Sequence, residues 1–95
     1  MSNLAVLDEA WTLSKSVALR PEPFGALAYH FGTRKLTFLK TPQLVEVVRL
    51  LAGYPDARSA LLAAGVPTAQ HTAYAAALEG LARADMVELR TGVTS

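Results

Sequence analysis

Few side chains in this sequence have the type and spacing that catalysis or metal binding requires. His30 and His71 are far apart and have no carboxylate at ligand spacing, whereas a metal site needs several converging donors. Ser14, Ser16 and Ser59 lack the G-x-S-x-G setting of a serine nucleophile and have no obvious base nearby. We therefore interpret the two histidines as structural, one in a strand and one at a helix start.

The acidic residues, the glycines and the missing cysteine lead to the same conclusion. Asp8-Glu9, Asp85 and Glu88 are typical of solvated chain segments rather than of an acid/base pair, and the glycines occur singly rather than in a phosphate-binding loop. The chain has no cysteine, which excludes disulfides, zinc–thiolate sites and iron–sulfur ligation by this protein. We predict that it is not an enzyme and holds no cofactor or metal.

The composition indicates one small domain without an obvious charged partner. The chain has 95 residues, of which 52% are hydrophobic and 18% charged, so it can build a core. Nine Lys and Arg against eight Asp and Glu give a net charge of +1, which argues against nucleic acid and anionic membranes as partners. The start has no secretory signal, and the apolar stretches are too short to cross a bilayer. We expect a soluble, cytoplasmic protein.

The first half of the chain predicts extended structure. Residues 11–19 alternate as a half-buried strand does, and the prolines at both ends of Pro21–Pro23 should interrupt regular pairing. Residues 25–31 and 35–39 then form a predicted β-hairpin around a turn at Gly32-Thr33-Arg34. One face of the first hairpin strand carries Leu27, Tyr29 and Phe31, and the other carries Ala26, Ala28 and His30.

The second half predicts a compact bundle of three helices. The first begins at Thr41-Pro42 and ends at Gly53, the second runs from Pro55-Asp56 to Ala64, and the third covers Gln70 to Ala84 with Thr68 as its expected cap. Residues 86–89 close the domain as a short extended piece. Strands followed by helices predict an α+β fold, and a winged helix-turn-helix-like core fits this order.

Two surfaces could receive another chain. The second hairpin strand, residues 35–39, is a candidate sheet edge, and such edges can bind a peptide as an added strand. The third helix could lie beside this edge, with Ala77 allowing close approach and Tyr74, Leu78 and Leu81 lining an apolar cleft. Taken singly, each of these helix positions fits better as an ordinary core residue in an alanine-rich helix, so the pattern permits a cleft but does not establish one.

DNA binding is a second hypothesis, since the helical half resembles a helix-turn-helix. A recognition helix reads bases from its first turns, where this chain offers only Gln70 and His71. Arg83 lies at the far end of that helix. A winged-helix DNA-binding regulator is therefore kept as the alternative, and a subunit that only stabilises an enzyme is a third possibility.

The sequence also resembles a known family. The stretches Val17–Leu27 (VALRPEPFGAL), Tyr29–Arg34 (YHFGTR) and Leu36–Lys40 (LTFLK) resemble the mycofactocin precursor-peptide chaperones, MftB, and the hydrophobic spacing from Leu44 to Val66 continues the likeness. The match covers most of residues 11–89. That family is similar to the PqqD-like domains that recognise ribosomally made, modified peptides (RiPP recognition elements).

The resemblance implies a fold and a function. The fold would be an amino-terminal three-stranded antiparallel sheet followed by three helices, with the recognition domain over residues 11–90, a flexible or irregular segment over 1–10 and a frayed tail over 91–95. Such a domain binds the leader region of its precursor peptide as an added strand, beside the third strand and against the third helix. It also docks on a radical SAM enzyme, which then modifies the peptide.

The matched elements assign expected roles to individual residues. Backbone groups of the third strand would bond the leader, apolar residues of the third helix would receive its side chains, and two cations would pair with its acidic residues. The strand residues are Leu36, Thr37, Phe38 and Leu39. The helix residues are Tyr74, Ala77, Leu78 and Leu81, and the two cations are Arg34 and Lys35. The block Arg20–Gly25 could shape a turn or contact the enzyme, and the exposed edge could equally support a homodimer.

Overall fold

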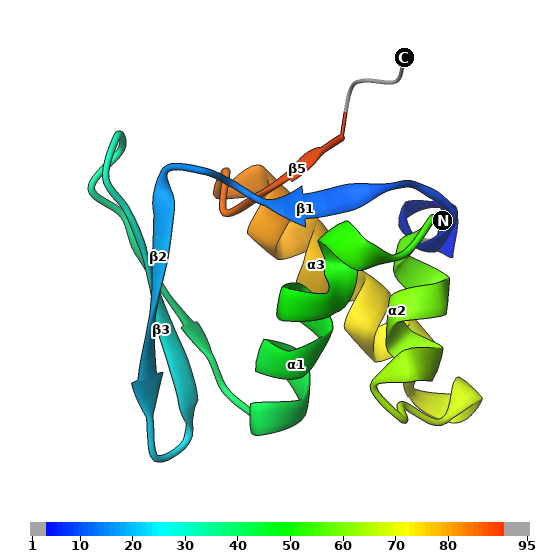
Figure 1. Cartoon of the computed structure of the whole chain (residues 1–95). Helices are drawn as coiled ribbons and strands as arrows, with labels where there is room; N and C mark the ends of the chain where they lie inside the picture. Colours follow the sequence, from blue (N-terminus) through cyan, green and yellow to red (C-terminus); the bar gives the residue numbers. More distant parts are fainter. Residues whose placement is uncertain (1–3, 91–95) are drawn as a thin grey trace.

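The computed structural model describes residues 4–90 and has a sheet of three antiparallel strands at one side of a group of three helices (Figure 1). The α+β class expected from the sequence is confirmed. Along the chain the elements are the 3-10 helix η1 (Leu4–Asp8), β1 (Trp11–Leu13), β2 (Val17–Glu22), β3 (Gly25–His30), β4 (Leu36–Leu39), α1 (Pro42–Leu50), η2 (Leu51–Gly53), α2 (Ala57–Ala63), η3 (Thr68–Gln70), α3 (His71–Arg83) and β5 (Val87–Leu89).

The turn between β3 and β4 is fixed by the side chain of a buried histidine. The Nδ1 atom of His30 accepts hydrogen bonds from the amides of Gly32 at 3.0 Å and Thr33 at 3.1 Å. The amide of Arg34, which has a left-handed φ of 64°, donates to the His30 carbonyl at 2.7 Å. His30 is therefore a structural residue that sets where β4 begins.

The proline at position 21 does not interrupt the sheet, contrary to the expectation from the sequence. Strand β2 continues through it, and Pro21 lies opposite Ala26 of β3. The amide of Phe31 donates to the Ser16 carbonyl at 2.8 Å. In an antiparallel ladder the backbone groups of successive residues point alternately towards the neighbouring strand and away from it. Because Ser16 points towards β3, Pro21, five residues later, points its nitrogen to the outer edge of β2, where no ladder donor is required.

A glycine allows the start of β3 to lie against the end of β4. Gly25 follows the two-residue turn Pro23-Phe24 and has a φ of 155°. A Cβ at this position would overlap the carbonyl oxygen of Leu39 and lie 3.1 Å from the backbone nitrogen of Thr41. Glycine is therefore required here for both conformation and space.

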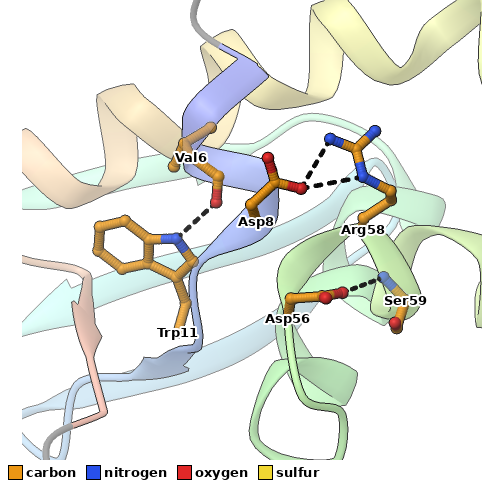
Figure 2. Close-up of polar contacts among 6 residues, drawn as sticks. All are labelled: Val6, Asp8, Trp11, Asp56, Arg58 and Ser59. Carbon is orange, nitrogen blue, oxygen red and sulfur yellow. Dashed lines mark hydrogen bonds and ion pairs between the residues drawn. The ribbon is translucent and has the colours of Figure 1, made fainter.

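Side-chain caps begin α1 and α2; the sequence predicted the cap at Thr41 and, for the second helix, only its start near Pro55-Asp56. The Thr41 hydroxyl accepts from the amide of Leu44 at 3.0 Å, with proline at the first helical position. The carboxylate of Asp56 accepts from the amide of Ser59 at 2.8 Å (Figure 2). Because this hydrogen bond favours the charged form, it lowers the pKa of Asp56 below the ordinary value.

The amino-terminal segment belongs to the core. Within residues 1–10, which the sequence suggested to be flexible or irregular, η1 forms a 3-10 helix that buries Val6 and Leu7. The indole Nε1 of Trp11 donates to the Val6 carbonyl at 2.9 Å (Figure 2). The largest fully buried side chains of the described chain come from η1, β4, the helices and the segment before β5: Leu7, Leu39, Val47, Val48, Leu51, Leu61, Leu78 and Met86.

The two ends of the described chain pair with each other. Strand β1 lies antiparallel to β5, with Trp11 opposite Leu89, rather than continuing into β2 as the single extended segment 11–19 suggested. The amide of Arg90 donates to the Ala10 carbonyl at 2.9 Å, and its guanidinium donates to the Ala52 carbonyl at 2.8 Å and to the Tyr54 carbonyl. The expected frayed tail, 91–95, lies outside the described residues.

Candidate functional site

The free edge of β4 carries backbone groups that could pair with another chain. In the sheet of order β2–β3–β4, β4 has a described neighbour only on the β3 side. The amide of His30 donates to the Lys35 carbonyl at 3.0 Å. Lys35 and Thr37 therefore point their backbone groups at β3, and the alternation turns those of Leu36 and Phe38 towards the free edge.

This geometry narrows the set of expected ladder residues. Of the four residues predicted to bond a peptide, Leu36 and Phe38 have suitably directed backbone groups. The backbone groups of Thr37 and Leu39 face β3, opposite Ala28 and Ala26. The sequence pattern could place a strand here, but only the register determines which residues face outwards.

The opposite edge of the same sheet is less suited to strand addition. On β2 the outward positions are Val17, Leu19 and Pro21. Pro21 has no N–H, and the amide of Val17 already donates to the Ser14 carbonyl at 3.1 Å. Only the amide of Leu19 then remains among the outward donors of β2. The free edge of β4 is therefore the better acceptor of an extended chain.

The β4 edge is flanked by positive charge. Arg34 and Lys35 precede the strand and Lys40 follows it, all three are exposed, and no acidic residue lies between them. None of the three forms an ion pair within residues 4–90. The ion pairs in that part of the chain are Arg20–Glu22 at 3.4 Å, Arg58–Asp8 at 2.9 Å (Figure 2) and Arg83–Glu79 at 3.2 Å.

Next to this edge, one face of the sheet exposes large apolar side chains. We call it the outer apolar face, and it comprises Phe24, Leu27, Tyr29, Phe31, Leu36 and Phe38. Phe31, Leu36 and Phe38 are 58–60% exposed and Phe24 is 43% exposed. The small residues Ala26 and Ala28 face the core instead, where β3 packs on α1. The alternation of large and small residues in the sequence contained this signal but did not show which face is buried.

The outer apolar face contains two aromatic pairs, one at each end of the sheet. Phe24 and Phe38 meet edge to face, with ring centroids 5.7 Å apart, at the end of the sheet near Lys40. Tyr29 and Phe31 meet in the same way at 5.4 Å, at the end near the β3–β4 turn. A hollow of about 250 Å³ lies between Phe24, Phe38 and Lys40.

The residues expected from α3 do not form an open cleft beside β4. Leu78 and Leu81 are 0% and 4% exposed and belong to the core. Tyr74 and Ala77 are half-buried, and the Tyr74 hydroxyl donates to Oε1 of Gln43 in α1 at 3.3 Å. Helix α3 packs mainly on η1 and β5, whereas β4 packs on β3 and α1. Reception of a peptide by Leu78 and Leu81 would therefore require the core to open.

The described residues contain no cluster of side chains that could hold a metal ion. Residues 4–90 include no group of three or more His, Asp or Glu side chains that could hold a metal ion. The Nε2 atom of His71 lies 3.1 Å from the Val66 carbonyl, so this histidine, like His30, has a structural contact. No helix in this part of the chain is long and apolar enough to span a membrane.

Known proteins match the chain over most of its length. The model of the peptide chaperone MftB family matches residues 10–88. The chain is 59% identical over 80 residues to the peptide chaperone MftB of Mycolicibacterium smegmatis, an alignment that covers 84% of this chain and 78% of that protein. The proteins of the same name from Mycobacterium ulcerans and Mycobacterium tuberculosis are 56% and 54% identical, with 84% of this chain and 73% of each relative covered. No solved structure matches the chain.

Proposed function

Because the chain belongs to the peptide chaperone MftB family, we propose that it binds the leader region of a mycofactocin-type precursor peptide and presents this peptide to a radical SAM maturase. The leader adds to the sheet as a strand on the free edge of β4. The chain itself contributes binding and no chemistry. The observation that carries the proposal is this edge, whose outward backbone groups have no strand partner among residues 4–90 and lie between flanking cations.

The edge supplies both hydrogen bonds and charge. The N–H and C=O groups of Leu36 and Phe38 form the ladder with the leader backbone. Arg34 and Lys35 pair with acidic leader residues, and each such exposed pair contributes about 0.2–1 kcal/mol. The binding energy therefore comes mainly from the ladder and from apolar contacts, while the cations favour an acidic leader over other segments.

The maturase must supply the redox centre. Radical SAM chemistry depends on an iron–sulfur cluster held by cysteines, and this chain has no cysteine. A domain that only binds can still raise the rate of maturation, because it increases the local concentration of the peptide at the enzyme. Loss of leader binding should therefore lower maturase turnover without altering the cluster.

A proline on the edge strand tests the position of the ladder. Leu36→Pro removes one outward N–H, and Leu36→Ala removes the same side chain while keeping that N–H. Pro21 on β2 already shows that this sheet accepts proline at an outward edge position. We expect Leu36→Pro to bind the leader about tenfold more weakly than Leu36→Ala, since a bond is lost and the ring obstructs the edge.

Calorimetric titration with a synthetic precursor peptide, its leader fragment and its core fragment gives the readout. Binding of the precursor and the leader, but not of the core, supports the proposal. If circular dichroism shows that both Leu36 variants are folded and they bind the leader with equal affinity, the leader does not pair with β4. Failure of all three peptides to bind the unaltered protein would contradict the peptide-binding role itself.

A further inference from the structure

The hollow at the carboxyl end of β4 has the size of a side-chain pocket. Its volume of about 250 Å³ is below the roughly 300–1,000 Å³ of pockets that enclose small molecules. Two of its walls are the rings of Phe24 and Phe38, which meet edge to face and are 43% and 59% exposed. Covering these rings with another apolar group removes aromatic surface from water, which is favourable.

The backbone of Phe38 connects this hollow to the free edge. Phe38 turns its N–H and C=O outwards, while its ring forms a wall of the hollow. Residues that lie side by side on neighbouring strands place their side chains on the same face of the sheet, with Cβ atoms roughly 4.5–5.5 Å apart. A peptide residue paired with Phe38 therefore directs its side chain to the outer apolar face, beside the hollow.

The third wall is the aliphatic part of the Lys40 side chain, which ends in a positively charged amine. Lys40 follows Phe38 by two residues, is exposed, and has no ion-pair partner among residues 4–90. Glu22, which lies two residues before Phe24, is paired with Arg20 at 3.4 Å. Side chains two positions apart on a strand lie on one face, roughly 7 Å from each other. A carboxylate two positions from the apolar peptide residue is therefore placed near the Lys40 amine.

From this geometry we infer that the hollow is a specificity pocket that takes one large apolar side chain of the bound peptide, while Lys40 pairs with a carboxylate two residues away from it. Leu36, two positions from Phe38 on the other side, adds an apolar contact. For a peptide that runs antiparallel to β4, the recognised segment thus has the pattern acidic–x–apolar–x–apolar in an extended conformation. The inference rests on the proposed strand addition at β4 and defines which leader side chains are recognised.

A double-mutant cycle between the protein and the leader tests the pocket. Phe24 is suited to this because it lies in the β2–β3 turn and contributes no backbone group to the β4 edge. The probes are a synthetic leader and variants in which each large apolar residue is replaced in turn by alanine. We expect Phe24→Ala to weaken leader binding about tenfold, as loss of an aromatic anchor does.

The coupling identifies the leader residue that fills the hollow. One alanine variant of the leader should lose about tenfold in affinity for the unaltered protein but less than about twofold for Phe24→Ala, because its contact is already absent. Lys40→Gln should similarly become insensitive to amidation of one acidic leader residue, located two positions from that apolar residue. Purely additive losses would overturn the inference.

Phe31→Ala is the matched control. Phe31 is an exposed phenylalanine of the same outer apolar face, but it contacts Tyr29 and does not line the hollow. We expect its affinity for the leader to stay within about twofold of the unaltered protein. Equal losses in Phe24→Ala and Phe31→Ala would indicate a diffuse apolar contact and overturn the pocket.

The pocket and the proposed function fail in different ways. If the leader binds the unaltered protein and Phe24→Ala with equal affinity, the pocket is refuted while strand addition at β4 stands. If the leader does not bind the unaltered protein at all, both are refuted. Circular dichroism of each variant confirms that a loss of binding does not result from unfolding.

Discussion

Replacing Gly25 by alanine should destabilise the sheet that carries the candidate site. Gly25 has a φ of 155°, which residues with a Cβ rarely adopt, and this costs about 1–3 kcal/mol. The added Cβ would also overlap the Leu39 carbonyl. Since that oxygen belongs to the backbone of β4, it cannot move without shifting the strand, and overpacking of this kind costs about 1–3 kcal/mol.

The two costs together predict a loss of about 2–6 kcal/mol in the free energy of unfolding. A domain of 95 residues has a total of roughly 5–14 kcal/mol, so the change should be large in a urea denaturation curve. Leader affinity should also fall, because the shift of β4 moves the outward groups of Leu36 and Phe38.

A second glycine provides the control. Gly80 lies in α3, and a Cβ there would meet no atom within 4 Å. Gly80→Ala should therefore stabilise the protein by about 0.5–1 kcal/mol, since alanine is the better helix former. If Gly25→Ala lost less than about 0.5 kcal/mol, the close approach of β3 to the end of β4 would not exist as described.

Two further predictions concern the contacts of Figure 2. Asp56→Ala should cost about 1 kcal/mol at neutral pH through loss of the α2 cap. Because the pKa of Asp56 is lowered in the folded state, this stabilisation is present above the unfolded-state pKa and should disappear as the pH falls through the folded-state pKa. Urea denaturation curves recorded at several pH values measure this change. Trp11→Phe should cost about 0.5–1.5 kcal/mol, because the Val6 carbonyl loses the indole donor and keeps only the hydrogen bond from the Glu9 amide at 3.4 Å. Circular dichroism is the suitable probe, since Trp11 is the only tryptophan, and a change below about 0.3 kcal/mol would show that the bond is dispensable.

Features decided by neighbouring residues could be predicted from the sequence. Thr41-Pro42 begins α1 as expected, because a hydroxyl cap and a proline act within one helical turn. The predicted hairpin is confirmed to within a residue or two, since β3 and β4 are strongly patterned and joined by a short turn. Thr68, expected to cap the third helix, instead lies in η3 and makes no capping bond.

Features decided by distant residues could not be predicted. The pairing of β1 with β5 depends on contacts between the two ends of the described chain, and the local sequence of neither strand predicts its partner. Pro21 is compatible with β2 only because its nitrogen faces the open edge, which the register decides. Without the register, a proline in a strand can only be interpreted as an interruption.

The position of the edge strand followed from the sequence, but its register did not. The alternating pattern and the short turn predicted residues 35–39 as an edge strand, and β4 (Leu36–Leu39) has a described neighbour on one side only. The pattern and the turn could not show that the backbone groups of Leu36 and Phe38 face outwards, because this depends on the hydrogen bond between His30 and Lys35, the residue before β4. The burial of Leu78 and Leu81 depends on the elements that pack on α3, and the exposure of Phe24 depends on which face of the sheet α1 covers.

The closure of β1 on β5 has a consequence for the order in which the newly synthesised chain folds. Strands β2, β3 and β4 are consecutive in sequence and can pair as soon as they leave the ribosome. Strand β1 must wait for β5, which is translated last among the described elements. The strands of this sheet are therefore available for pairing before β5 can complete the core, and an exposed sheet edge is open to unintended pairing during that interval.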